Sequence, residues 1–380
     1  MIIVSRLFAP EVGAAAFRLK ALATALDDAG AIVQVLTTRP PQGGQCDDAP
    51  LKVSRWPVLR DAGGNVRGYI QYLSFDVPVF FRLLFSRGAD VIVVEPPPTT
   101  GFFVSLAAAI RMTPFVYFSA DVSSSAAKGI GLRGPVLAIL TGLERFVLRR
   151  AKSILAVSEG VKSEVAALTG RSANVHNVGT GVDTRVFSYL GPEMAGGGQY
   201  FVYAGTMSEI QGAGVFVDAF LTIADEYPGV RLIMFGQGVE LAALKEKAKV
   251  AGDSIMFKPP VSGEEVSTWL RAAVANLASV RPGMGYDFAF ATKSLAGMSA
   301  GAPAIYAGVG PLRGIIEENN LGHVCEWDVL EVASAMKRAI EQSVTPQRRS
   351  EISAWVDENY SLGAVGRTAA GVVLMSGKRR

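Results

Sequence analysis

The sequence predicts an α/β protein made of two Rossmann-like domains whose parallel sheets face a central cleft. Two observations predict this fold. Short, continuous apolar strands alternate with helical segments, and the whole alternation occurs twice, on either side of a glycine-rich break. Strands that are apolar along their whole length are typical of parallel sheets covered on both faces. A chain of 380 residues, 49% of them apolar, is long enough for two cores.

The first half contains seven candidate strands with helical patterns between most of them. Between the first two strands, apolar residues from Phe17 to Leu26 recur at helical spacing, and Gly30 follows where a C-cap is expected. The predicted strands are residues 2–8, 32–37, 52–57, 91–95, 115–119, 154–158 and 175–178.

The second half repeats the scheme with six candidate strands. These are residues 201–204, 231–235, 255–257, 275–280, 304–306 and 324–326. Between the halves, GPEMAGGG at residues 191–198 breaks every periodicity. We therefore expect an N-terminal domain over residues 1–190, a linker over 191–198 and a C-terminal domain over 199–345. Helices over residues 346–380 are expected to cross back to the N-terminal domain.

Cysteine content and hydropathy exclude several classes of protein. Cys46 and Cys325 lie far apart without partners at metal spacing, which argues against a disulfide framework or a structural zinc and favours a reducing compartment. The opening MIIVSRLF is interpreted as a first strand and not as a signal peptide. No segment has the length of apolar sequence that a membrane span needs. The closest, residues 69–85, is either a buried or cleft-edge helix or an interfacial segment that dips into lipid headgroups.

Positive charge is concentrated in the first half of the chain. Residues 1–190 contain 20 Lys and Arg against 14 Asp and Glu, whereas residues 191–380 contain 17 against 20. Arg145, Arg149, Arg150 and Lys152 cluster near a helix end, and the chain closes with Lys378–Arg380. These residues are either solvated helix ends or a patch attracted to an anionic membrane surface. A nucleic-acid partner is not favoured, because no aromatic platform accompanies them.

The segment Tyr286–Gly308 indicates a phosphate-binding site. It places Lys293 at the start of a small-residue helix that ends at Gly301-Ala302-Pro303, followed by a buried strand. A lysine near a helix N-terminus opposes the helix dipole, so its presence there indicates a bound anion.

Four segments together resemble a known family. FAPEVGAAAFRLKALATAL, LERFVLRRAKSILAVSEGVKSEV, GTGVDTRVF and YAGTMSEIQGAGVFVDAF resemble, in that order, landmarks of the retaining GT-B glycosyltransferases of family 4. The similarity is closest to the subgroup that builds bacterial cell-surface glycans, and it runs from about residue 7 to residue 325. It implies the GT-B fold, an acceptor-binding N-terminal domain and a C-terminal domain that binds a sugar nucleotide.

In the N-terminal domain the resemblance singles out three residues. Gly13 matches a loop that approaches the donor diphosphate and the acceptor, or it serves only as a turn. Arg18 matches an arginine of the subgroup, although an exposed helix-surface arginine is the favoured interpretation. Asp121 follows a strand where the family has a polar residue facing the sugar or acceptor hydroxyl, and it would accept the hydroxyl proton or orient it. The alternative role for Asp121 is a helix N-cap, which is the role favoured for Ser158.

In the C-terminal domain, Gly205-Thr206 ends the first strand and Gln211 begins the next helix. Many family members have an arginine and a lysine at about the positions of Thr206 and Gln211. Uncharged groups donate hydrogen bonds but cannot supply positive charge to a departing diphosphate. Lys293 is therefore the leading candidate for that cation, and Arg281 is the second.

Further residues match the nucleotide-sugar site of the family, and one expected feature is missing. Gly236 and Gly238 resemble the family's Gly-x-Gly beside the nucleotide, and residues 258–261 match the stretch that borders the base. Typical members have two glutamates eight positions apart, where this chain has Phe288 and Ala296. Asp287, beside the first, is a candidate contact for sugar hydroxyls.

The resemblance implies front-face transfer with retention of configuration, in which the leaving diphosphate takes the proton of the attacking hydroxyl. No metal or other cofactor is expected, and His176 and His323 are interpreted as structural. The expected partners are a nucleotide-sugar donor, a glycan or lipid-linked acceptor and an anionic membrane surface, at the cytoplasmic face of the cell membrane. The missing glutamates leave two alternatives open, a sugar-nucleotide isomerising enzyme and a non-catalytic partner protein.

Overall fold

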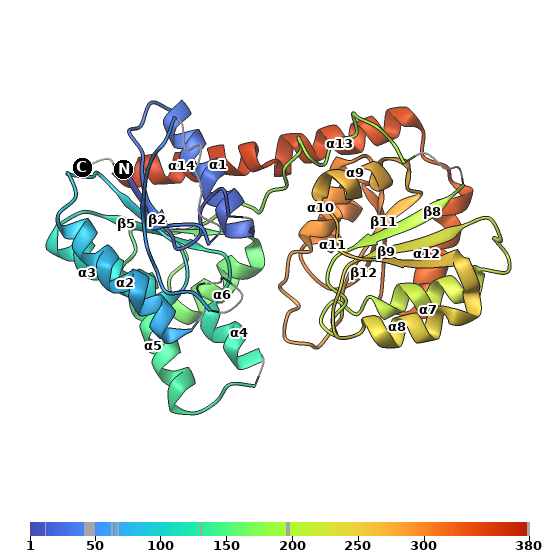
Figure 1. Cartoon of the computed structure of the whole chain (residues 1–380), viewed down its shortest axis with the longest axis horizontal. Helices are drawn as coiled ribbons and strands as arrows, with labels where there is room; N and C mark the ends of the chain where they lie inside the picture. Colours follow the sequence, from blue (N-terminus) through green and yellow to red (C-terminus); the bar gives the residue numbers. More distant parts are fainter. Residues whose placement is uncertain are drawn as a thin grey trace. The chain divides into compact units, whose positions relative to one another are not determined.

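The computed structural model describes residues 1–11, 13–41, 50–61, 64, 66, 68–129, 131–194 and 198–377 (Figure 1). The chain divides into two compact units. Unit 1 comprises Met1–Thr180 and Leu362–Arg380, and unit 2 comprises Gly181–Ser361. The division falls ten residues before the position expected for the linker, of which residues 195–197 lie outside the described residues, as do Cys46 and Lys378–Arg380.

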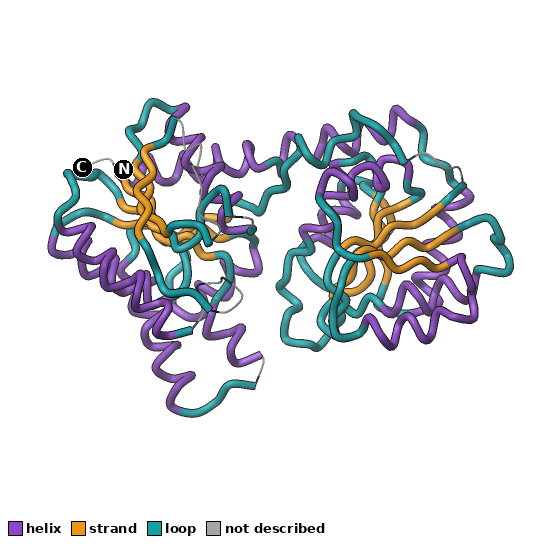
Figure 2. Tube along the Cα trace, viewed as in Figure 1, coloured by secondary structure: helices purple, strands orange, loops and turns teal. Residues whose placement is uncertain are grey.

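Unit 1 is built on a seven-stranded parallel sheet in the order β3-β2-β1-β4-β5-β6-β7 (Figure 2). The strands are β1 (Ile2–Val4), β2 (Gln34–Thr38), β3 (Lys52–Trp56), β4 (Ile92–Val94), β5 (Phe115–Ser119), β6 (Ser153–Ala156) and β7 (Val175–Asn177). The central strands β1, β4 and β5 are buried along their whole length, which is why their sequences are apolar except for Ser119 at the end of β5.

The helices of unit 1 cover both faces of this sheet. They are α1 (Ala14–Asp28), α2 (Tyr69–Leu84), α3 (Pro98–Ile110), α4 (Ser123–Gly129), α5 (Pro135–Arg150), α6 (Glu159–Thr169) and α14 (Leu362–Gly377). α14 comes from the end of the chain and packs on α1, while α3 packs between α2 and α5 (Figure 1). Gly366 allows the first contact, because a Cβ there would lie 2.7 Å from the carbonyl oxygen of Ala21.

Unit 2 is built on a six-stranded parallel sheet in the order β10-β9-β8-β11-β12-β13. Its strands are β8 (Tyr200–Ala204), β9 (Arg231–Phe235), β10 (Ile255–Lys258), β11 (Ala275–Val280), β12 (Ala304–Gly308) and β13 (Gly322–Cys325). Its helices are α7 (Gly214–Ile223), α8 (Leu241–Ala248), the 3-10 helix η1 (Lys249–Ser254), α9 (Gly263–Ala272), α10 (Thr292–Ser299), α11 (Leu312–Glu318), α12 (Val329–Glu341) and α13 (Pro346–Tyr360).

The predicted α/β class is confirmed, and each of the thirteen predicted strands has a counterpart in the structure. Three of them, β5, β9 and β11, have the predicted bounds. The first strand is shorter than predicted. Ser5 Oγ accepts a hydrogen bond from the Leu7 amide at 3.0 Å and donates one to the Leu7 carbonyl at 2.7 Å, which folds the chain back after Val4.

Both sheets have a point where the strand order reverses. In unit 1 the reversal lies between β1 and β4, and in unit 2 it lies between β8 and β11. Loops at the carboxyl ends of such neighbouring strands diverge and leave a crevice, the usual ligand site of open parallel sheets. The candidate site residues are found in these two places.

Candidate active site

Lys293 is the second residue of α10, and its ammonium group lies at the carboxyl edge of the unit 2 sheet. Nζ donates hydrogen bonds to the Tyr203 hydroxyl at 2.8 Å and to Gln211 Oε1 at 2.5 Å, and it lies 4.5 Å from the centroid of the Tyr203 ring. Both acceptors are neutral, and the described residues provide no carboxylate partner. Burial alone lowers the pKa of Lys293 to about 7. An anion bound beside Nζ would therefore stabilise the charged form of this lysine.

The loop after β8 is held against Lys293 by residues without side chains. Gly205 has a φ of +159°, and a Cβ there would lie 2.9 Å from Lys293 Nζ. A Cβ on Gly236 would lie 1.9 Å from the Gly205 carbonyl oxygen, and one on Gly238 would lie 2.1 Å from that of Met207. Glycine is therefore required for the loops after β8 and β9 to pack backbone to backbone. A role of these glycines in nucleotide binding stays a prediction.

Thr206 and Gln211 occupy the two ends of the same loop. The Thr206 carbonyl accepts a hydrogen bond from the Tyr203 hydroxyl at 2.7 Å, so Tyr203 links this residue to Lys293. The Gln211 carbonyl accepts one from Ser279 Oγ at 2.5 Å. The structure thus brings Lys293 to Thr206 and Gln211, although it lies more than 80 residues from both in the sequence.

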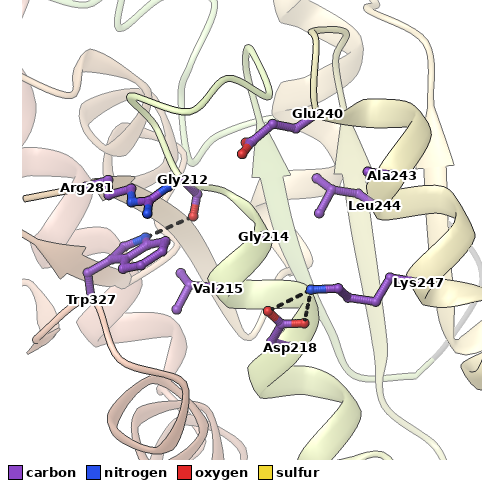
Figure 3. Close-up of a pocket in the computed structure, with 10 residues that line it drawn as sticks. All are labelled: Gly212, Gly214, Val215, Asp218, Glu240, Ala243, Leu244, Lys247, Arg281 and Trp327. Atoms are coloured by element: carbon purple, nitrogen blue, oxygen red, sulfur yellow. Dashed lines mark hydrogen bonds and ion pairs between the residues drawn. The ribbon is translucent and has the colours of Figure 1, made fainter. Parts of the chain in front are cut away.

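Arg281 follows β11 and contacts the same loop from a different side. Its amide donates to the Ile210 carbonyl at 2.9 Å, and its guanidinium carbon lies 4.7 Å from the Trp327 ring centroid. Arg281 and Trp327 line a cavity of about 250 Å³, where the Glu240 carboxylate points into the same space (Figure 3). Both predicted cations therefore lie beside the loop 205–211, but only Lys293 bonds to its side chains.

The positions of the missing glutamates are Phe288 and Ala296. Phe288 stacks on Tyr286 with ring centroids 6.1 Å apart. Asp287 Oδ1 accepts a hydrogen bond from the Gly283 amide at 3.1 Å, which closes the loop after β11 and leaves the second carboxylate oxygen for a ligand. Ala296 lies on α10 one turn after Lys293 and offers no polar group.

Unit 1 has a second, more polar cavity of about 270 Å³ at its own switch point. Three arginines and three carboxylates line it. They are Arg6, Arg18, Arg60, Glu11, Glu95 and Asp121. Arg60 pairs with Glu11 at 2.9 Å, and Arg18 pairs with Glu95 at 3.5 Å. This pocket is charge-balanced by its own residues.

Asp121 lines this cavity without an ion-pair partner among the described residues. Its Oδ1 accepts a hydrogen bond from Ser123 Oγ at 3.4 Å, and partial desolvation by the surrounding protein raises its pKa. The N-cap interpretation is wrong. Glu144, on α5, accepts hydrogen bonds from the Ser123 and Ser124 amides at 2.8 and 2.9 Å and so caps α4 instead. The Asp121 carboxylate is left available to a ligand.

Three other predictions for unit 1 have clear outcomes. Arg18 is not an exposed surface residue: only 9% of it is exposed, because it turns inward to pair with Glu95. Ser158 caps α6 as predicted, by accepting a hydrogen bond from the Val161 amide at 3.2 Å. Gly13 is the N-cap of α1, where a Cβ would lie 2.9 Å from the Leu7 side chain.

Sequence reasoning missed Arg6, Glu11, Arg60 and Glu95. Glu95 could have been predicted, because it directly follows the buried strand β4, and Asp121 was predicted from a similar position two residues after β5. Arg6 has a similar signal, since it is a charged residue two positions after the apolar strand β1. Arg60 and Glu11 are joined across 49 residues of chain and have no local signature. The described residues contain no cluster of His, Cys, Asp and Glu that could hold a metal ion.

Family models match both halves of the chain. The model described as "Glycosyl transferase 4-like domain" matches residues 13–181, and that described as "Glycosyl transferases group 1" matches residues 198–342. No curated protein matches in sequence.

Solved structures match along the whole chain at low identity. HepE from Anabaena in complex with UDP has 14% identity and a TM-score of 0.69, covering 98% of this chain and 99% of that one. The catalytic domain of starch synthase IV from Arabidopsis thaliana, bound to ADP and acarbose, has 13% identity and a TM-score of 0.72, covering 100% and 99%. The lipopolysaccharide outer core galactosyltransferase WaaB has 14% identity and a TM-score of 0.66, covering 98% of each chain.

The two parallel-sheet units and these structural similarities define a protein of the GT-B fold. The two family models together match most of the chain. The protein accordingly belongs to the GT-B glycosyltransferases.

Proposed function

We propose that the protein is a retaining glycosyltransferase of family 4 that moves a hexosyl group from a nucleotide sugar to a hydroxyl of a glycan, lipid-linked or small-molecule acceptor. The observation that carries this proposal is Lys293, a cation with neutral hydrogen-bond partners at the switch point of unit 2. Solved structures of the same fold hold UDP or ADP, which supports a nucleoside diphosphate as its counter-ion. The structural similarity to WaaB, a lipopolysaccharide outer core galactosyltransferase, supports the part of the proposal that places this activity in cell-envelope glycan synthesis.

In the proposed reaction the anomeric C–O bond to the diphosphate breaks as the acceptor oxygen bonds to the same face of the sugar. Lys293, Arg281 and backbone amides of the loop after β8 stabilise the negative charge that develops on the departing diphosphate. That diphosphate takes the proton of the attacking hydroxyl, so the step needs no metal. Asp121 orients the hydroxyl from unit 1, and Asp287 binds sugar hydroxyls in unit 2.

A thermal-shift panel of nucleoside diphosphates tests the donor half of this proposal. A ligand at 100 times its dissociation constant adds about 2.7 kcal/mol to the free energy of unfolding. Lys293→Ala should abolish most of that shift, and should lower transfer from the matching donor about 100- to 1000-fold. Lys245→Ala, which removes an exposed lysine of α8, is the matched control and should change neither quantity.

The outcomes separate the remaining candidates. Unchanged nucleotide affinity and turnover in Lys293→Ala would show that the donor site lies elsewhere. Nucleotide binding without transfer to any acceptor would favour a non-catalytic partner protein, a role compatible with the missing carboxylate at Ala296. Conversion of the donor without an acceptor would identify an isomerising enzyme.

A further inference from the structure

The loop between β11 and α10 carries two aromatic side chains that the hydrophobic core does not use. Tyr286 and Phe288 are half-buried and stack on each other, with ring centroids 6.1 Å apart and ring planes inclined by 26°. The next residues, Ala289 and Phe290, pack against a core cluster of unit 2, whereas neither stacked ring belongs to any core cluster of the described residues. Aromatic rings kept outside the core are typical of the lining of ligand sites.

This loop is held in a defined shape by local contacts at the carboxyl edge of the sheet. Asp287 Oδ1 accepts the hydrogen bond from the Gly283 amide at 3.1 Å. A Cβ on Gly310, in the loop after β12, would lie 2.9 Å from the Ala289 carbonyl oxygen, so the two loops are packed closely together. The stacked rings are therefore presented by a fixed loop.

The same loop leads directly to Lys293, where the donor diphosphate of the proposed function binds. Phe288 precedes Lys293 by five positions, so their Cα atoms lie at most about 17 Å apart. The Thr292 amide donates a hydrogen bond to the Phe290 carbonyl at 2.9 Å, which bends this connection and shortens the distance further. Because the sugar of a donor is joined directly to its diphosphate, a diphosphate at Lys293 brings the sugar within reach of the stacked rings.

Phe288 changes what this part of the site can recognise. The family resemblance places a glutamate at this position, and a carboxylate accepts hydrogen bonds from sugar hydroxyls. A phenyl ring accepts none of comparable strength, so a hydroxyl turned toward it loses its hydrogen bonds to water without replacement. A methyl group in the same place is removed from water against an apolar surface, which is favourable. The ring therefore favours a sugar that presents a methyl group to it.

We propose that Tyr286 and Phe288 select a donor whose sugar bears a methyl group, as a 6-deoxyhexose or an N-acetylhexosamine does. This inference rests on the proposed function and narrows its donor. Asp287, beside Phe288, keeps one carboxylate oxygen for the remaining sugar hydroxyls. Apolar contact with a single methyl group discriminates between substrates roughly 10- to 100-fold, which is the preference expected here.

Binding of a matched donor series tests this selection. The series consists of the glucosyl, 6-deoxyglucosyl and N-acetylglucosaminyl esters of the nucleoside diphosphate that gives the largest thermal shift, and calorimetry measures each dissociation constant. At least one methyl-bearing ester should bind about 10- to 100-fold more tightly than the glucosyl ester. The tighter of the two identifies which methyl group the rings contact. A glucosyl ester that binds as tightly as both others, or more tightly, would overturn the proposal.

The Phe288→Gln variant links the preference to the ring. Its amide hydrogen-bonds to hydroxyls and is uncharged, so the ratio of dissociation constants should shift at least about tenfold toward the glucosyl ester. Affinity for the bare nucleoside diphosphate should be unchanged, because the ring contacts only the sugar. Phe85→Gln, at an exposed phenylalanine of unit 1, is the matched control and should change neither quantity. A ratio that moves equally in both variants, or in neither, would contradict the assignment.

Failure of this proposal is distinguishable from failure of the proposed function. Tight binding of a nucleoside diphosphate without any preference within the ester series would overturn the selection and leave the donor site at Lys293 intact. Loss of affinity for the bare nucleoside diphosphate in Phe288→Gln would show that the ring contacts the nucleotide, which also overturns the selection. If no nucleoside diphosphate raises the melting temperature of the wild type, the donor site is wrong and the selection fails with it.

Discussion

The two switch points of this protein differ in whether their charged side chains have partners of opposite charge. In unit 1, three arginines and three carboxylates line the cavity, and two of the arginines form ion pairs within it. In unit 2, Lys293 has only the neutral Tyr203 and Gln211 as partners. A charge-balanced pocket favours a neutral ligand that hydrogen-bonds to its residues, whereas a desolvated lysine without a carboxylate partner is stabilised in its charged form by an anion. We therefore expect the two crevices to bind chemically different ligands.

The largest effect on stability is expected from removing one charge of the Arg18–Glu95 ion pair in unit 1. Arg18→Met leaves Glu95 buried without its cation, and should lower the free energy of unfolding by about 3–5 kcal/mol. Chemical denaturation measures this loss. Adding Glu95→Gln to Arg18→Met should recover much of it, because no buried charge then remains unpaired. A single variant as stable as the wild type would contradict the ion-pair assignment.

In unit 2, replacing the unpaired cation Lys293 is expected to raise the free energy of unfolding. The folded-state pKa of Lys293 is about 7, below the 10.5 of an unperturbed lysine, so between these pH values the unfolded chain binds more protons at this residue. The ligand-free protein therefore becomes more stable as pH rises through this window. Lys293→Met should raise the free energy of unfolding at pH 7 by about 1–2 kcal/mol, since it removes a desolvated charge.

Denaturation at two pH values checks this sign. The advantage of Lys293→Met over the wild type should shrink near pH 10, where the wild-type lysine is already neutral in the folded state. A variant less stable than the wild type at pH 7 would show that the hydrogen bonds to Tyr203 and Gln211 outweigh the desolvation of the ammonium group.

A smaller effect is expected on the acceptor side. Asp121→Asn keeps the shape of the side chain but removes its charge, and should lower transfer about tenfold if the carboxylate orients the acceptor hydroxyl. Nucleotide affinity should stay unchanged, because Asp121 lies in unit 1 and Lys293 in unit 2. Kinetics with varied acceptor measure the effect. Asp61→Asn alters a carboxylate outside this cavity and is the control. A smaller thermal shift with nucleoside diphosphates in Asp121→Asn would contradict the assignment of Asp121 to the acceptor and of Lys293 to the donor.

A pH dependence of donor affinity is also expected, and near pH 7 it is small. Between about pH 6, where the terminal phosphate loses its last proton, and pH 7 the ammonium form of Lys293 predominates and nucleoside diphosphate affinity should be nearly constant. Above pH 7 binding must take up a proton, so affinity should fall by up to about tenfold per pH unit. Calorimetry in buffers of different ionisation enthalpy measures the proton uptake directly. The effect should vanish in Lys293→Arg, because arginine stays protonated.

The sequence predicted the fold well because buried strands have a recognisable local pattern of apolar residues. Strands such as β5, β9 and β11 are mostly apolar and almost wholly buried, and this pattern marks both their type and their bounds. Lys293 was also visible locally, since its position at a helix start opposes the dipole. The capping role of Glu144 was not visible, because α4 and α5 meet only in the fold and the local sequence offered Asp121 as an equally good cap.

By itself, then, the sequence determined the alternation of strands and helices, the glycines where loops cross and the position of Lys293 at a helix start. The tertiary structure alone decided which charges are neutralised. Arg18 meets Glu95 in unit 1, whereas Lys293 meets only a tyrosine and a glutamine in unit 2. The physical reason is that secondary structure follows from interactions within a few residues, whereas the pKa of a buried group depends on neighbours that the fold brings from 80 or more residues away.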